Sequence, residues 1–220
     1  MAQHEESAPS TLSEQTYSTL VSMIMSKELE GGQVLEERPL SKKLSVSRTP
    51  LRIAFGRLLG EGLTRRLSNG YYVVNAPTTE DYLHLLQLRR LLEADAASRA
   101  AGNLPKAVSQ SLRERLTAMQ DREFDEDDDA TATFELDDDF HEAIADASGN
   151  PWLARTIKDV RRRVRMCNVK RYPGRFRQTC QEHLAILDAI DKGDAEGTRK
   201  ALEAHLDEVW TGFMQLLTKR

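Results

Sequence analysis

Apolar residues recur every three or four positions along most of this chain, a spacing that predicts amphipathic helices. After Pro77 the pattern predicts six helices, separated by breaks rich in glycine, proline or acidic residues. Their predicted ranges are 79–101, 105–121, 130–148, 151–172, 175–192 and 195–218. No alternation typical of strands follows Val74. The second part of the chain is therefore predicted to be an all-α antiparallel helical bundle.

The first part of the chain predicts two short helices joined by a tight turn. Apolar positions in residues 40–46 predict the first helix, and Ser47 stands where it can cap the second. Pro50 falls in the first turn of the second helix, where a backbone N–H has no intrahelical partner to lose. The apolar positions of this helix are predicted to face a core; they are Leu51, Phe55, Leu58 and Leu59.

Arg48, Thr49 and Arg52 cluster at the exposed N-terminal end of the second helix, an arrangement suited to the major groove of DNA. Residues 63–74 then predict two short strands folded about Asn69-Gly70, so a β-hairpin wing follows directly. Basic residues exceed acids strongly in this region, which suits a polyanion, although a solvated basic surface is the alternative. Between residues 38 and 66, one acid, Glu61, accompanies Arg38, Lys42, Lys43, Arg48, Arg52, Arg57, Arg65 and Arg66.

Composition agrees with a mainly α protein of two domains. The chain has 220 residues, of which 40% are hydrophobic and 30% charged, with a net charge of -4. It has no apolar run long enough to span a bilayer and no signal peptide, so we expect a cytoplasmic location and no membrane partner. Cys167 and Cys180 are expected to be reduced structural thiols. The predicted divisions are a disordered tail 1–13, a winged helix-turn-helix 14–76, a linker 77–79 and a helical domain 80–220.

The candidate chemistry of the helical domain lies in its histidines. Asp137 and His141 are four residues apart, which places a carboxylate and an imidazole on one helix face. His183 and His205 are flanked by apolar positions on two later helices, so both are expected to point inward. One carboxylate and three imidazoles suit Zn²⁺, Ni²⁺, Mn²⁺ or Fe²⁺. The alternative is that each histidine is a buried, hydrogen-bonded side chain and that Asp137 is solvated.

Arg89 on the first helix of this domain adds a cation that can bind a carboxylate with two parallel hydrogen bonds. A surface ion pair with Glu93 is the competing interpretation, because the two residues are four positions apart. Arg161, Arg162, Arg163 and Arg165 form a basic run that predicts a solvated helix face, with one member lining a pocket as the alternative.

Two sets of residues, in this order along the chain, resemble the GntR family of bacterial transcription regulators. The resemblance covers residues 14–217 and points to the FadR-like branch with an FCD ligand-binding domain. The first set is Tyr17, Leu20, Ile24, Leu35, Glu36, Leu40, 46–52, Arg57, Leu58, 61–63 and Gly70. The second set is Leu88, Arg89, Leu92, Glu93, 137–141, 148–150, Glu182, His183, Ala189, Ile190, Gly193, Asp194, His205 and Leu206. Six helices in place of seven resemble the VanR-like subgroup.

The resemblance implies a role for each matching position. The residues that match DNA-contacting positions are Arg38, Arg48, Thr49, Arg52 and the wing-tip Gly70. Those that match the metal ligands are Asp137, His141, His183 and His205, and Arg89 matches an arginine that meets an acidic effector. Ser45 and Gly56 depart from the family pattern. Ser45 replaces a turn glycine, and Gly56 is expected to weaken its helix by about 1 kcal/mol relative to alanine.

These observations predict an effector-responsive homodimeric repressor that binds a palindromic operator in double-stranded DNA. A divalent transition metal and Arg89 are expected to bind a small organic acid, which shifts the arrangement of the two winged domains. One alternative is a metal-dependent enzyme that uses metal-bound water, but no clear additional acid or base accompanies the ligands. Glu142 and Glu182 are expected to face away from the bundle interior. The other alternative is a regulator whose metal site is purely structural.

Overall fold

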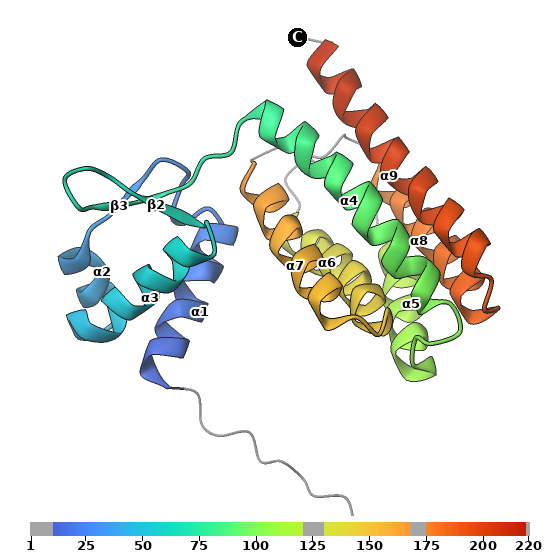
Figure 1. Cartoon of the computed structure of the whole chain (residues 1–220), viewed down its shortest axis with the longest axis horizontal. Helices are drawn as coiled ribbons and strands as arrows, with labels where there is room; N and C mark the ends of the chain where they lie inside the picture. Colours follow the sequence, from blue (N-terminus) through green and yellow to red (C-terminus); the bar gives the residue numbers. More distant parts are fainter. Residues whose placement is uncertain (1–10, 121–129, 168–174, 219–220) are drawn as a thin grey trace, which may run out of the picture. The chain divides into compact units, whose positions relative to one another are not determined.

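The computed structural model describes residues 11–120, 130–167 and 175–218 (Figure 1). Most of the predicted N-terminal tail lies outside these residues. The chain divides into two compact units, Met1–Pro77 and Thr78–Arg220, and each is considered by itself. The fold is mainly helical with one small antiparallel sheet, which confirms the predicted fold class.

The first unit is a winged helix-turn-helix. Its helices are α1 (Leu12–Met25), α2 (Glu37–Lys43) and α3 (Arg48–Gly60), and its strands are β1 (Val34–Leu35), β2 (Thr64–Arg66) and β3 (Tyr72–Val74). The sheet order is β1-β3-β2, with both pairings antiparallel. The predicted hairpin is present as β2 and β3. The pattern of residues did not predict β1, which has only two residues and pairs with β3.

Helix α1 begins inside the segment predicted to be a disordered tail. Thr11 and Glu14 form a capping box in which each side chain accepts a hydrogen bond from the other residue's backbone N–H. This cap fixes the helix start at Leu12, two residues before the predicted domain boundary. Tyr17 and Leu20 on this helix are buried in the core of the first unit.

The turn between α2 and α3 is a Schellman motif. The N–H of Val46 donates to the carbonyl of Ser41, and the N–H of Ser45 donates to that of Lys42. Ser45 adopts a φ of 54°, which is the left-handed conformation usually reserved for glycine. Helix α2 accordingly ends at Lys43, earlier than predicted, and it also begins earlier, at Glu37. Ser47 occupies the N-cap position of α3, but its side chain makes no capping hydrogen bond.

Helix α3 buries a narrow apolar stripe. Leu51, Phe55 and Leu58 are fully buried, as predicted, whereas Leu59 is 37% exposed and lies off the stripe. The hairpin that follows closes through two backbone hydrogen bonds, from Leu67 N–H to Tyr71 and from Gly70 N–H to Leu67. Gly70 has a φ of 88°, so the turn requires a residue that tolerates the left-handed region.

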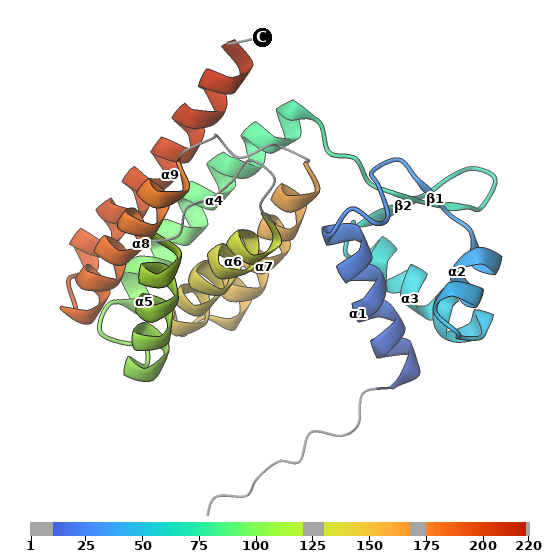
Figure 2. The same cartoon turned by 180° about the vertical axis from the view of Figure 1, so that it is seen from behind.

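The second unit is a bundle of six described helices (Figure 2). They are α4 (Thr79–Ala100), α5 (Lys106–Gln120), α6 (Ala130–Ala147), α7 (Pro151–Met166), α8 (Phe176–Asp191) and α9 (Ala195–Thr218). Most of their bounds lie within one residue of the predicted ones because local signals set them. Helix α7 ends at Met166, earlier than the predicted residue 172, and residues 168–174 lie outside the described part of the chain. Thr78 and Asp81 form a capping box at the start of α4, and the side chain of Asn150 caps α7 just before Pro151.

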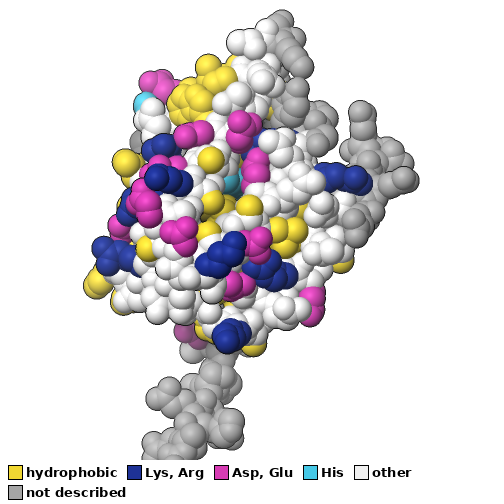
Figure 3. All heavy atoms as spheres, turned by 90° about the vertical axis from the view of Figure 1, so that its right-hand side faces the viewer, with side chains coloured by type: hydrophobic (Ala, Val, Ile, Leu, Met, Phe, Trp, Pro, Cys, Tyr) yellow, Lys and Arg dark blue, Asp and Glu magenta, His cyan; other side chains and the backbone are white. Residues whose placement is uncertain are grey.

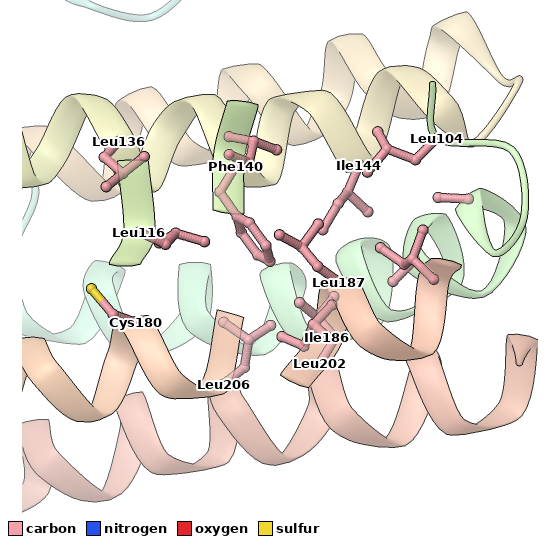
Figure 4. Close-up of a cluster of buried hydrophobic side chains, with 14 residues drawn as sticks. Leu104, Leu116, Leu136, Phe140, Ile144, Cys180, Ile186, Leu187, Leu202 and Leu206 are labelled. Atoms are coloured by element: carbon pink, nitrogen blue, oxygen red, sulfur yellow. The ribbon is translucent and has the colours of Figure 1, made fainter. Parts of the chain in front are cut away.

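The core of this bundle is formed by aliphatic side chains around Phe140 (Figure 4). Leu187 and Ile144 lie beside Phe140, and Ile186, Leu202 and Leu206 continue the cluster toward α9. These contacts fix the facing sides of α6, α8 and α9. Among the described helices, none is long and apolar enough to cross a membrane. Neither Cys167 nor Cys180 forms a disulfide in the described part of the chain.

Candidate DNA-binding surface and candidate metal centre

The predicted DNA-contacting residues lie on the surface of the first unit. Arg48, Thr49 and Arg52 are exposed at the N-terminal end of α3, and Arg38 is exposed on α2. Gly70 stands at the tip of the β2–β3 hairpin. The helix end and the hairpin tip are the two features of a winged domain that approach the major groove and the phosphate backbone.

Arg52 already has a partner within the protein. Its Nε donates to Glu37 Oε1 at 2.8 Å, although 64% of the arginine side chain is exposed. This hydrogen bond lowers the pKa of Glu37, so the carboxylate is ionised at neutral pH. A contact between Arg52 Nε and DNA would require this hydrogen bond to break.

Three histidines from three helices converge inside the second unit. His141 on α6, His183 on α8 and His205 on α9 each offer a ring nitrogen, and these nitrogens lie within 4.8 Å of one another. All three side chains are buried. The Nε2 atoms of His183 and His205 are 3.3 Å apart, and Phe140 stacks on the His183 ring at 3.8 Å between centroids.

Asp137 adds a carboxylate to this cluster. Its Oδ1 lies 4.0 Å from His141 Nε2 and 3.8 Å from His183 Nε2. Its Oδ2 accepts a hydrogen bond from Arg161 Nη2 at 2.8 Å. The structure therefore brings together all four residues that the sequence proposed as metal ligands. Their role as ligands remains a proposal.

Two glutamates contact the outer nitrogens of the cluster. Glu93 Oε2 is 2.7 Å from His141 Nδ1, and Glu182 Oε2 is 2.7 Å from His205 Nδ1. An ionised carboxylate only accepts hydrogen bonds, so each Nδ1 carries the proton and each Nε2 presents a lone pair. The expectation that Glu182 faces away was wrong, because it binds both His205 and Arg175. Glu142 has a partly exposed side chain, 3.7 Å from Lys158.

Burial and neighbouring charge set the ionisation of this cluster. Burial, with a contribution from Arg161, lowers the pKa of His141 to about 4. Burial and the two other histidines hold the pKa of His183 well below its usual value. Burial would raise the pKa of Glu93, but Arg89, His141 and Arg161 together hold it well below its usual value. At neutral pH His141 and His183 are therefore neutral and Glu93 is ionised, and a neutral imidazole is the form that binds metal ions.

Two arginines border the cluster from different helices. Arg89 on α4 binds Glu93 through Nε at 2.7 Å and Nη2 at 3.4 Å. The ion pair with Glu93 is therefore present, but it is buried and not on the surface. Arg161 on α7 is 4% exposed, which corrects the expectation of a solvated face for this residue. Sequence spacing does contain a signal for it, because Arg161 follows the buried Ala154 and Ile157 at helical intervals.

The donor set fits a divalent transition metal. His141 Nε2 is buried and has no hydrogen-bond partner among the described residues. Three imidazole nitrogens and one carboxylate oxygen converge there, and carboxylates behind two of the imidazoles fix the ring orientation, as in known metal sites. The residues that would hold the ion are Asp137, His141, His183 and His205.

Comparison with known proteins identifies both units. The family model of bacterial regulatory proteins of the gntR family matches residues 12–73, and the FCD domain model matches residues 84–208. The chain belongs to the GntR family of regulators with an FCD domain. It is therefore a transcriptional regulator with a GntR DNA-binding domain and an FCD effector-binding domain. Both matching families are of regulators and not of enzymes.

Individual relatives agree with this membership. The GntR–FCD chain is 31% identical to the Escherichia coli K12 protein named "Putative L-lactate dehydrogenase operon regulatory protein", covering 92% of this chain and 86% of the relative. It is 26% identical to the E. coli K12 HTH-type transcriptional repressor RspR, covering 93% and 90%. The solved structure of E. coli McbR/YncC superposes with a TM-score of 0.80 at 22% identity, over 95% of this chain and 100% of that one. That likeness shows the fold.

Proposed function

We propose that this regulator represses transcription as a homodimer on a palindromic operator, reading DNA through Arg38, Arg48, Thr49, Arg52 and the wing tip at Gly70. The observation that carries the DNA-binding part is the exposed basic N-terminal end of α3 next to a hairpin. A repressor role is supported by the likeness to RspR, which is named a repressor. We also assign the chain to the VanR-like subgroup on its six described helices.

A homodimer has support in the surface of the second unit. Leu88 and Leu91 on α4 are 45% and 67% exposed, and Trp152 at the start of α7 is 75% exposed. Figure 3 shows one face of the molecule, on which hydrophobic side chains lie among interspersed acidic and basic ones. Contiguous exposed apolar side chains are typical of surfaces that associate, and Leu88 and Leu91 are three positions apart on one face of α4. Two winged domains in one dimer would engage the two half-sites of a palindrome.

Replacing Arg48 with alanine tests the DNA assignment. If Arg48 contacts a guanine, the Arg48→Ala variant loses about 1–3 kcal/mol of binding to the cognate site. Fluorescence anisotropy in matched salt would measure binding to an operator selected from random DNA and to a scrambled duplex. Arg155→Lys, on the helical unit, serves as the control. Equal affinity of Arg48→Ala and the parent protein for the operator would refute the assignment.

We further propose that the four-residue cluster binds a divalent metal and that metal and protein together bind a small carboxylic acid. The observation that carries the metal is the convergence of three buried imidazole nitrogens beside Asp137. A bound divalent ion would supply positive charge and coordination positions for a carboxylate oxygen. The sequence assigns Arg89 as the protein cation for this anion. Binding would shift the equilibrium between arrangements of the paired winged domains and so change operator affinity.

Elemental analysis of untagged protein, purified without chelator, tests the metal. We expect a transition metal, and we expect His205→Ala to remove it and to lower the melting temperature of metal-treated protein. Calorimetry with L-lactate, suggested by the name of the E. coli relative, and with malonate tests the effector. A metal that stays bound while no carboxylate binds would favour the purely structural site. No bound metal, and no change in melting on adding zinc, would refute the centre.

A further inference from the structure

The guanidinium of Arg161 has more hydrogen-bonding capacity than its protein neighbours use. Its Nη2 donates to Asp137 Oδ2 and to Asp138 Oδ1, each at 2.8 Å. Its Nε and Nη1 are buried and have no hydrogen-bond partner among the described residues. Buried donors on a charged group are costly when unsatisfied, so these two nitrogens have the capacity to bind a further acceptor.

Arg161 also lies beside the proposed metal centre. Its Nη1 is 3.7 Å from Glu93 Oε1, and the other oxygen of Glu93 binds His141 Nδ1. Its Nη2 binds Asp137, whose other oxygen faces His141 and His183. The guanidinium thus lies beside the two carboxylates nearest to His141, whose own Nε2 is buried and has no hydrogen-bond partner among the described residues.

Arg89 is less available for the same task. Its Nε and Nη2 both engage the Glu93 carboxylate, one nitrogen on each oxygen. Because that glutamate also binds His141 Nδ1, the role that these contacts support for Arg89 is to fix Glu93. The family resemblance favoured Arg89, since α7 carries five arginines and their partners lie on other helices as well as on their own.

The charge around the centre changes when a metal is added. Arg89, Arg161 and Arg165 are paired with three carboxylates, Glu93, Asp137 and Asp138. These six charges balance, and a divalent ion would add two positive charges to them. The ion would also bind Asp137, the carboxylate that pairs with Arg161. The cluster then has excess positive charge in a buried place, and an anionic ligand restores the balance.

We propose that Arg161 is the side chain that binds the carboxylate of the effector, while Arg89 holds Glu93 against His141. The proposal rests on the carboxylate-sensing function proposed above. It differs in naming a residue of α7, with Nη1 and Nε as the donors.

Conservative substitutions test the proposal without removing the buried charge. Arg161→Lys keeps a cation beside Asp137 and Asp138 but loses the planar set of donors. Arg89→Lys is the competing variant, and Arg162→Lys on the same helix is the control, because Arg162 is one-third exposed and near Asp159. Each full-length protein would be loaded with zinc, checked for metal content and titrated calorimetrically with malonate and with L-lactate.

We expect Arg161→Lys to keep its zinc and to bind the carboxylate about ten-fold or more weakly, while Arg162→Lys binds like the parent protein. We expect Arg89→Lys to weaken binding less. A parent protein that binds neither probe would overturn carboxylate sensing, and this inference with it. Parent-like affinity in Arg161→Lys would overturn this inference alone. Loss of zinc from Arg161→Lys would overturn it too, because Arg161 would then act by positioning Asp137.

Discussion

Replacing Glu182 with glutamine is a sensitive test of the metal centre. Glu182 Oε2 accepts the Nδ1 proton of His205 at 2.7 Å, and this contact leaves the Nε2 lone pair facing His183. Glutamine has nearly the same shape but no charge, so it polarises the imidazole less. Glu182 is also 19% exposed, so its substitution should perturb folding far less than substitution of the buried Glu93.

The expected loss of zinc affinity follows from the position of Glu182 behind a proposed metal ligand, His205. Replacing a group that orients a metal-ligating histidine typically lowers metal affinity by about 10- to 100-fold. A ten-fold change corresponds to about 1.4 kcal/mol, so Glu182→Gln should cost about 1.4–2.7 kcal/mol of metal-binding free energy. The melting temperature of the zinc-saturated protein should fall accordingly, while that of the chelated protein should change little.

Competition between the protein and a chromophoric chelator for zinc would measure the affinity. Glu208→Gln is a matched control, since Glu208 binds the same Arg175, through Nη1 at 3.3 Å, but contacts no histidine among the described residues. We expect the control to bind zinc like the parent protein. Equal zinc affinity of Glu182→Gln and Glu208→Gln would show that the carboxylate behind His205 does not support an ion, and the reasoning would fail.

Three stability predictions concern local backbone features. Gly56→Ala should stabilise the protein by about 0.5–1 kcal/mol in urea unfolding, because nothing lies within 4 Å of the added methyl group in α3. Ser45→Gly should stabilise it by about 1 kcal/mol, since Ser45 holds a φ of 54° in the Schellman motif; an unchanged midpoint would contradict the strain. Thr78→Ala removes half of the capping box of α4 and should cost about 1 kcal/mol, whereas Thr79→Ser leaves the box intact.

Most helix boundaries in the second unit could be predicted because they depend on neighbouring residues. Gly149 and Asn150 end one helix and cap the next, and Gly193 closes α8 with a φ of 70°. Such signals act within a few residues of the chain. Strand β1 lacks them, since Val34 and Leu35 are extended through pairing with a strand far along the sequence.

The candidate site was predictable only in part for the same physical reason. His183 and His205 have apolar neighbours at helical spacing, so their inward direction follows from the sequence. The roles of Glu93, Glu182 and Arg161 depend on partners from other helices. A charged residue on a helix is ordinarily solvated, and only the assembled bundle shows that Glu93 and Arg161 are buried among opposite charges.

Because Arg52 and Glu37 form an ion pair, Glu37 competes with DNA for the guanidinium of Arg52. When Arg52 leaves Glu37 for a phosphate on random DNA, one anionic partner replaces another. The exchange therefore adds little binding free energy. Once released, Glu37 stands beside a polyanion and is repelled by it. A guanine that binds Arg52 through two hydrogen bonds can outweigh both effects. We therefore expect the Glu37 carboxylate on α2 to lower the affinity for random DNA more than the affinity for the operator. It would thereby increase the specificity for the operator.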